Sequence, residues 1–277
     1  MTNASTSLSG TSVPRPARPS KLWQVLAHSS ATAWIVPVLL ILVWQVGSSL
    51  GLIAANVLPS PLDVLAAAWR LVRSGALFEN VQVSFLRAFT GLIVGGGIGF
   101  ALGLGNGLSK LSENLTDSTL QMVRNIPHLA LLPLVILWFG IGEEAKLFLV
   151  ALGVFFPIYL NTLHGIRTVD PQLVEMGKSY GMTTATLFRR IILPGALPSI
   201  FVGLRYALGI MWLTLIVAET IAAQSGIGHM AMEAREFMQV DIVVFAILLY
   251  AALGKLADWV TRQLEKLCLS WHPAFQV

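Results

Sequence analysis

The sequence contains few charged residues and almost no cysteine. Only 12% of its 277 residues are Asp, Glu, Lys or Arg, about half the share found in typical soluble domains. The single cysteine, Cys268, excludes a disulfide within the chain. Hydrophobic residues make up 55% of the sequence, and the mean hydropathy is +0.74. This composition excludes an ordinary soluble globular protein and indicates a membrane protein.

Motifs for catalysis and nucleotide binding are also missing from the sequence. No G-x-x-x-x-G-K-[ST] phosphate loop occurs, because the segment GNGLSK at 105–110 lacks its spacing and the following hydroxyl residue. The sequence has no H-E-x-x-H, no cysteine–histidine cluster for zinc and no G-x-S-x-G elbow. We therefore expect a chain that is not an enzyme, binds no cofactor or metal itself, and depends on another protein for energy.

Six apolar stretches are long enough to cross a bilayer, which takes about 20 helical residues. Their approximate limits are 32–52, 85–108, 120–139, 146–165, 197–222 and 241–262. Long uninterrupted runs favour helices over barrel strands. The sequence thus predicts an all-α polytopic membrane protein, with a six-helix domain at 31–267 between a disordered tail at 1–30 and a C-terminal tail at 268–277. The tail at 1–30 is basic like the start of a signal peptide, but the apolar run after it is too long to be cleaved.

The distribution of lysine and arginine predicts the orientation, since cytoplasmic loops are enriched in both. Four of these residues fall on one side of the predicted membrane and eleven on the other. The eleven are Arg15, Arg18, Lys21, Lys110, Arg124, Arg167, Lys178, Arg189, Arg190, Arg262 and Lys266. We therefore expect both termini, and the polar loop at 170–195, to lie in the cytoplasm.

A short helix at about 60–74 is predicted on the outer membrane surface. Ser60 suits the N-cap, Pro61 the first helical position and Asp63 the first turn. One face of this helix carries apolar residues at helical spacing: Leu62, Leu65, Trp69 and Val72. The helix either receives an external partner or seals the edge of the bundle.

The second apolar stretch contains a row of glycines, each four residues after the last. They are Gly91, Gly95, Gly99, Gly103 and Gly107. Such a row lets two helix backbones approach closely, which favours helix packing in membranes. A sliding surface in a moving transporter is the alternative interpretation.

The third stretch carries two prolines, Pro127 and Pro133, and is therefore expected to be kinked or locally opened. Arg124 and His128 lie one turn apart on its cytoplasmic half. Both are candidates for lining a transport pathway. A histidine in such a place is also commonly just a hydrogen-bonded interior residue.

The fifth stretch carries three residues on one helical face, because Arg205, Trp212 and Glu219 recur every seven positions. Charged groups facing lipid are costly, so this face should point into the bundle or an aqueous path. For Arg205 the sequence leaves open a pathway role and an ion pair with another helix. Glu219 is near the outer end and could simply be interfacial.

The loop at 170–195 has the pattern of two short helices. Asp170 and Pro171 are expected to open the first, which runs to about Tyr180, and Gly181 allows the chain to reverse. Thr183 or Thr184 can cap the second, which runs to about Arg190 and is expected to end at Leu193-Pro194. The predicted result is a compact knob joined to the fourth and fifth spans.

Five residues of this loop follow the spacing E-x5-G-x9-I-x-L-P: Glu175, Gly181, Ile191, Leu193 and Pro194. The pattern resembles the E-A-A-x3-G-x9-I-x-L-P signature of permease subunits in binding-protein-dependent ATP-binding-cassette (ABC) importers. Here Met176 and Gly177 replace the two alanines. The resemblance implies that this loop forms the coupling helices that dock into a cytoplasmic ATPase.

The resemblance extends over about residues 32–275. LPSPLDVLAAAW at 58–69, RNIPHLALLPLVILWFGIGEEAK at 124–146, LPGALPSI at 193–200 and MWLTLIVAETI at 211–221 are similar to the aliphatic-sulfonate branch of the family. Taurine and nitrate permeases share much of this, so taurine, nitrate or another small anion is the alternative cargo. From the residues alone, a gradient-driven secondary transporter or channel also remains open.

The resemblance implies a type I importer in the bacterial inner membrane. Two copies of the permease would pair, each with one ATPase subunit that carries ATP and Mg. A periplasmic or lipid-anchored binding protein would deliver an aliphatic sulfonate to the outer face. Arg205, and after it Arg124, would suit an anion in a low-dielectric path.

Overall fold

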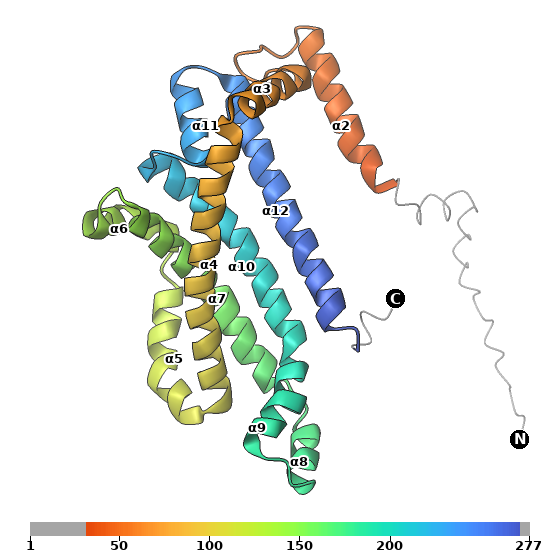
Figure 1. The fold of residues 1–277 in the computed structure, drawn as a ribbon, viewed down its shortest axis with the longest axis vertical. Coiled ribbons are helices and arrows are strands. Elements are labelled where there is room, and N and C mark those ends of the chain that lie inside the picture. The colour runs from red at the N-terminus through yellow and green to blue at the C-terminus, as the bar shows by residue number, and fades with distance from the viewer. Residues whose placement is uncertain (1–31, 272–277) are drawn as a thin grey trace, which may run out of the picture. The chain divides into compact units, whose positions relative to one another are not determined.

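The computed structural model describes residues 32–271, and every regular element in that range is a helix (Figure 1). The expected tail at 1–30 therefore lies outside the described residues. The chain divides into two units, Met1–Leu52 and Ile53–Val277. In the first unit, α2 (Thr32–Ser49) is apolar around its whole circumference and contains Pro37. All of the following description concerns the second unit.

Helix α3 (Pro61–Ser74) begins with the predicted cap. The Ser60 hydroxyl accepts a hydrogen bond from the Asp63 backbone N–H at 3.2 Å, and the Asp63 carboxylate accepts one from the Ser60 backbone N–H at 3.1 Å. This reciprocal pair is a capping box. The helix ends at Gly75, whose φ is 79°. The predicted apolar stripe is exposed, and Val64 and Ala67 on the other face are buried.

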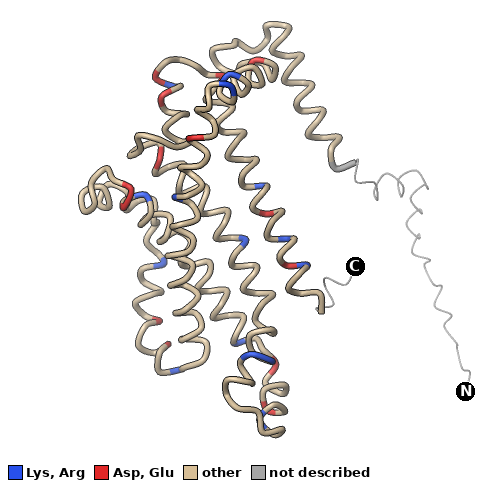
Figure 2. Tube along the Cα trace, viewed as in Figure 1, with Lys and Arg blue, Asp and Glu red and all other residues tan. Residues whose placement is uncertain are grey.

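Within residues 32–271, four helices are long and apolar enough to cross a membrane. They are α4 (Ala76–Leu108), α7 (Glu143–Arg167), α10 (Leu193–Ala222) with the short elements before it, and α12 (Val240–Cys268). In Figure 1 they run between an end that holds α3 and α11 (Ile227–Glu236) and an end that holds α8 (Pro171–Ser179) and α9 (Thr184–Leu187). Figure 2 shows that charged residues lie at both ends and along α12.

A fifth span is broken in the middle. Helix α5 (Lys110–Arg124) and the pair η1 (His128–Leu131) and α6 (Leu132–Phe139) meet at an angle of 79°. Pro127 stands at the N-cap of η1 and Pro133 in the first turn of α6, so the predicted opening of this span is confirmed. The predicted count of six is not reached by long helices alone. The described residues give four, or five with the broken span, and the first predicted span, 32–52, contains only the shorter apolar helix α2.

The glycine row of α4 faces α7 along the whole contact. A Cβ atom added at Gly91 would lie 2.5 Å from Val150 Cγ1, and one at Gly103 would lie 2.8 Å from the Tyr159 carbonyl oxygen. At Gly95 it would overlap the backbone of Ala151. The two backbones are therefore closer than any larger residue would allow, as the packing interpretation requires.

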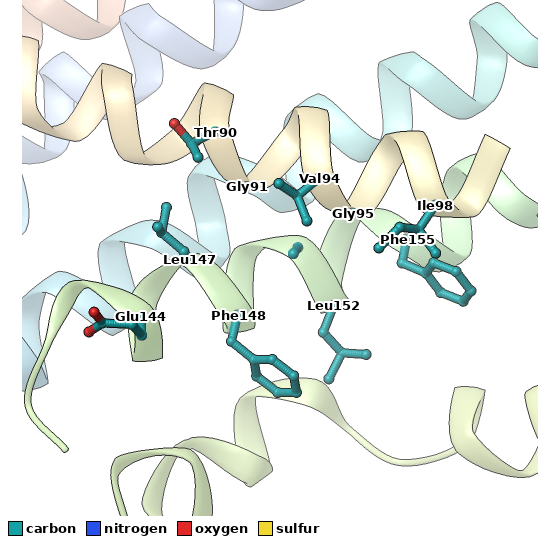
Figure 3. A pocket seen from close by; sticks show the side chains of 11 residues that line it. Thr90, Gly91, Val94, Gly95, Ile98, Glu144, Leu147, Phe148, Leu152 and Phe155 are labelled. Carbon is teal, nitrogen blue, oxygen red and sulfur yellow. The ribbon is translucent and has the colours of Figure 1, made fainter. Parts of the chain in front are cut away.

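An apolar groove of about 460 Å³ runs beside this contact (Figure 3). Its walls are side chains of α4 and α7, among them Val94, Ile98, Phe148, Leu152 and Phe155.

Helix α7 also packs against α10, and α10 packs against α12. Helix α7 is thus the central helix of the unit, with contacts on two sides.

Candidate functional site

The loop at 170–195 has the local structure that its sequence predicts up to Leu187. The Asp170 carboxylate accepts a hydrogen bond from the Gln172 N–H at 2.8 Å and starts α8. Gly181 has a φ of 73°, which favours glycine. The Thr183 hydroxyl accepts from the Thr186 N–H at 3.4 Å and starts α9.

The predicted end of the second short helix at Leu193-Pro194 is wrong. Helix α9 continues through a π-helical turn, η2 (Phe188–Ile192), directly into α10. Pro194 stands directly after the π-helical turn, at the start of α10. The second short helix of the loop is therefore continuous with α10.

The knob is tightly packed at one of the positions where the sequence departs from the signature. Gly177 is buried, and a Cβ atom there would lie 2.7 Å from Leu187 Cδ1 and 2.8 Å from Ile191 Cδ1. Glycine thus allows α8 to lie closer to α9 and η2 than alanine would. On α8 the apolar Met176 is 48% exposed beside the exposed Glu175, and Tyr180, the C-cap of this helix, is 79% exposed.

At the opposite end, Glu219 of α10 is the centre of a buried polar network. Its side chain has no exposed surface. The carboxylate accepts hydrogen bonds from Arg87 Nη1 at 2.9 Å, Ser84 Oγ at 2.8 Å, Gly228 N at 3.0 Å and Tyr250 OH at 3.0 Å. These donors come from α4, α11 and α12, so one carboxylate joins four helices.

Arg87 extends the network to α7. Its Nε and Nη2 donate to the two carboxylate oxygens of Glu143 at 2.5 and 2.6 Å, and Lys146 Nζ donates to the same carboxylate at 2.9 Å. Arg87 and Lys146 are both buried. The sequence analysis did not select Arg87, Glu143 or Lys146. The signal was available, since a charged residue within an apolar run marks a functional or pairing position.

The remaining residues of the predicted α10 face also have partners within the chain. Arg205 forms ion pairs with Glu265 and, at 3.4 Å, with Asp258, both on α12. Trp212 is buried against Tyr250, with ring centres 6.3 Å apart and an edge-to-face angle of 69°. This face therefore points into the bundle, and for Arg205 the structure shows the ion pair with another helix.

The opposite face of α10 lines a cavity of about 340 Å³. The other walls come from the break between α5 and η1 and from the middle of α7. The lining residues are Arg124, Ile126, His128, Leu152, Gly153, Phe156, Pro157, Leu160, Asn161, Tyr206 and Ile210. Two of the predicted pathway residues, Arg124 and His128, are thus brought together, and Arg205, Trp212 and Glu219 are not among the residues that line it.

His128 is held in this wall by a hydrogen bond. Its Nε2 lies 3.0 Å from the hydroxyl of Thr214 on α10. A Cβ atom at Gly153 would lie 3.0 Å from that hydroxyl and 3.3 Å from Nε2, so glycine leaves room for the pair. The interior, hydrogen-bonded histidine expected from the sequence is what the structure shows.

The cavity is positively charged at one place only. Among residues 32–271, Arg124 is the only charged residue that lines the cavity, and no Asp or Glu lines it. Within that range Arg124 forms no ion pair, in contrast to Arg87 and Arg205.

The same part of the chain brings no three His, Cys, Asp or Glu side chains together in a way that could hold a metal ion.

Comparisons with known proteins agree with this architecture. Residues 95–268 match the family described as "Binding-protein-dependent transport system inner membrane component". The chain is 56% identical to an Escherichia coli protein with the provisional name aliphatic sulfonates transport permease protein SsuC, over 94% of this chain and 98% of that one. It is 34% identical to the taurine transport system permease protein TauC of E. coli, over 86% and 88% of the two chains.

Among solved structures, a chain from the crystal structure of an amino acid ABC transporter with histidines has the same fold. The match has a TM-score of 0.54 and 19% identity, and covers 71% of this chain and 97% of the other. The matched family region includes the coupling loop, the broken span and the cavity. The chain therefore belongs to the family of inner membrane components of binding-protein-dependent transport systems.

Proposed function

We propose that this chain is the membrane permease subunit of an ABC importer for aliphatic sulfonates. The observation that carries the proposal is the 56% identity to the E. coli SsuC chain over 98% of that chain's length. A second relative with the same provisional name, from Bacillus subtilis, is 43% identical over 87% of this chain. The cation in an otherwise neutral cavity favours an anionic cargo.

The proposed complex contains two copies of the permease, two cytoplasmic ATPase subunits and an external binding protein. ATP and Mg are bound by the ATPases, and both termini of the permease are cytoplasmic. The knob formed by α8, α9 and η2 receives the ATPase movement. Because η2 runs into α10 without a break, closure of the ATPases moves a wall of the cavity and opens it outward. Hydrolysis then returns the cavity to the inward-facing state.

Taurine, nitrate or another small anion is the second candidate cargo, supported by the 34% identity to the taurine permease. A gradient-driven carrier is the candidate from a different class, but it would leave the knob without a partner. Proteoliposomes that contain the permease, its ATPase and its binding protein distinguish these candidates. We expect uptake of labelled hexanesulfonate that requires both ATP and the binding protein. Uptake driven by an ion gradient without ATP, or uptake of taurine or nitrate in place of the alkanesulfonate, would contradict the proposal.

The coupling role is tested by reversing one exposed charge on the knob. Glu175→Lys should release the ATPase or uncouple its hydrolysis without unfolding the permease, because Glu175 is exposed and forms no ion pair among the described residues. Gln172→Lys also introduces an exposed lysine on the same helix, with a net-charge change of one unit instead of two, and serves as the control. Co-purification of the ATPase and stimulation of hydrolysis by loaded binding protein are the measurements. Equal loss in both variants would show a nonspecific charge effect and would refute a role for the signature glutamate.

A further inference from the structure

The cavity beside α10 is lined by one arginine, Arg124, that differs from the arginines of α4 and α10 in having no acidic partner among residues 32–271. The other arginines inside the apolar helices are neutralised: Arg87 by Glu143 and Glu219, and Arg205 by Glu265 and Asp258. Arg124 has no such partner among residues 32–271, and it faces a cavity without acidic residues. The Arg124 side chain is exposed, so its charge is open to water or to an anion at this place.

The backbone at this place is also unusual. Arg124 is the last residue of α5 and His128 the first of η1, so the chain is non-helical between them, midway along the broken span. Irregular backbone at membrane depth is tolerated where it lines a cavity or is covered by protein. Transporters commonly form substrate sites at interrupted helices of this kind. The break thus provides an observation independent of the charge.

The rest of the lining separates into a polar and an apolar part. Tyr206 and His128 supply polar groups near the break, and Tyr206 makes no hydrogen bond within the described range. The apolar part comes mainly from α7, with Leu152, Phe156 and Leu160, and from Ile210 of α10. A volume of about 340 Å³ lies at the lower end of the range for small-molecule sites. The site therefore suits a small molecule with one anionic head and one short apolar tail.

We propose that this cavity is a discrete binding site for one alkanesulfonate within the membrane. The sulfonate group is bound by Arg124 with the Tyr206 hydroxyl as a further donor, and the alkyl chain lies against the apolar wall of α7. Arginine suits this role because its planar guanidinium can donate two parallel hydrogen bonds to an oxyanion. Recognition then does not rest with the external binding protein alone. The assignment of the sulfonate rests on the proposed function, and the site itself on the geometry.

The phosphate headgroup of an anionic lipid has similar chemistry, since it also combines an oxyanion with an apolar tail. The test must therefore distinguish a bound alkanesulfonate from a bound lipid headgroup. We choose the permease–ATPase complex without binding protein, reconstituted in nanodiscs of phosphatidylcholine, which has no net charge. Binding of radiolabelled hexanesulfonate is measured by scintillation proximity, and again in nanodiscs that contain phosphatidylglycerol.

We expect saturable binding in phosphatidylcholine that Arg124→Met weakens by about 10- to 100-fold, the range for loss of a charge-assisted hydrogen bond. Arg124→Lys should retain part of the affinity, because it keeps the charge but not the planar fork. Lys110→Met removes one positive charge from the opposite end of the same helix, away from the residues that line the cavity, and should bind like the wild type. In a series from methane- to hexanesulfonate, each buried methylene should improve affinity by up to about fourfold.

Three binding results would overturn the proposal. One is the absence of saturable binding to the wild type in phosphatidylcholine, and another is equal affinity of the wild type and Arg124→Met. The third is that Arg124→Met abolishes co-purification of phosphatidylglycerol but leaves sulfonate binding unchanged, which would make a lipid the occupant. Failure of the proposed function is recognised separately, because it would abolish ATP-dependent uptake by the wild-type complex. Normal uptake by both the wild type and Arg124→Met would refute only the site.

Discussion

The buried carboxylate of Glu219 gives the sharpest prediction about stability. Substitution by glutamine keeps the size and shape of the side chain but replaces one acceptor oxygen by an NH₂ group. In the wild type, Oε1 accepts from Arg87 Nη1 at 2.9 Å and Oε2 accepts from the backbone N–H of Gly228 at 3.0 Å. The hydroxyls of Ser84 and Tyr250 can rotate, but these two N–H donors cannot. Whichever way the amide is oriented, one fixed donor faces the NH₂ group.

The expected loss in the free energy of unfolding has two contributions. An unsatisfied buried donor costs about 1–3 kcal/mol, and removing one partner of a buried ion pair costs about 3–5 kcal/mol when the remaining charge has no other partner. Arg87 keeps its two hydrogen bonds to Glu143. We therefore expect Glu219→Gln to lower the free energy of unfolding by about 2–4 kcal/mol. At about 2–4 °C per kcal/mol, the scale for soluble domains of this size, the midpoint of thermal unfolding falls by roughly 5–15 °C.

The assay is fluorescence-detected size-exclusion chromatography of detergent-solubilised protein after heating. Glu233→Gln on α11 is the matched control, since Glu233 is exposed at the same end of the structure. In a double-mutant cycle, Arg87→Met combined with Glu219→Gln should cost less than the sum of the two single substitutions, because they remove the same ion pair. A midpoint for Glu219→Gln within about 1 °C of the control, or strict additivity in the cycle, would refute the reasoning.

Two further predictions concern helix packing and the second ion pair. Gly95→Ala should lower the unfolding midpoint, at a cost of about 1–3 kcal/mol for overpacking, because its Cβ would overlap the backbone of Ala151. Gly97→Ala, with no atom within 4 Å of the added Cβ, should be neutral or stabilising in the same assay, and equal effects would contradict the close α4–α7 contact. Arg205→Met should destabilise the protein by about 2–3 kcal/mol, since it leaves Glu265 unpaired with only 6% of its side chain exposed. Glu265→Gln should restore most of that loss, and a raised KM for sulfonate uptake in the stable double variant would instead show that Arg205 contacts the cargo.

Features that depend on neighbouring residues were predictable from the sequence. The capping box at Ser60, the helix start at Asp170 and the reversal at Gly181 all appear in the structure at the expected positions. Each depends on groups within about four positions, so the sequence contains all the partners. The glycine row is similar, because absent side chains predict a close approach whatever helix approaches.

The error at Leu193-Pro194 has a local cause as well. Proline ends a helix that precedes it but also suits the first turn of one that follows. The residues around Pro194 do not show which of these two roles it takes. In the structure a π-helical turn, η2, precedes Pro194 and continues the helix. The structural consequence is that the knob continues into α10 without a hinge.

The sequence by itself determined that the chain is an all-helical membrane protein, where most of its helices begin, and that one polar loop carries the signature of an ATPase-coupled permease. It placed Arg124, Arg205 and Glu219 together as candidates for a pathway. Only the tertiary structure separated them, because an ion pair depends on partners that are distant in the chain, such as Arg87 and Glu219, which are 132 positions apart. Folding neutralises Arg205 and Glu219 within the bundle and leaves Arg124 facing an open cavity, where its charge is available to an anion.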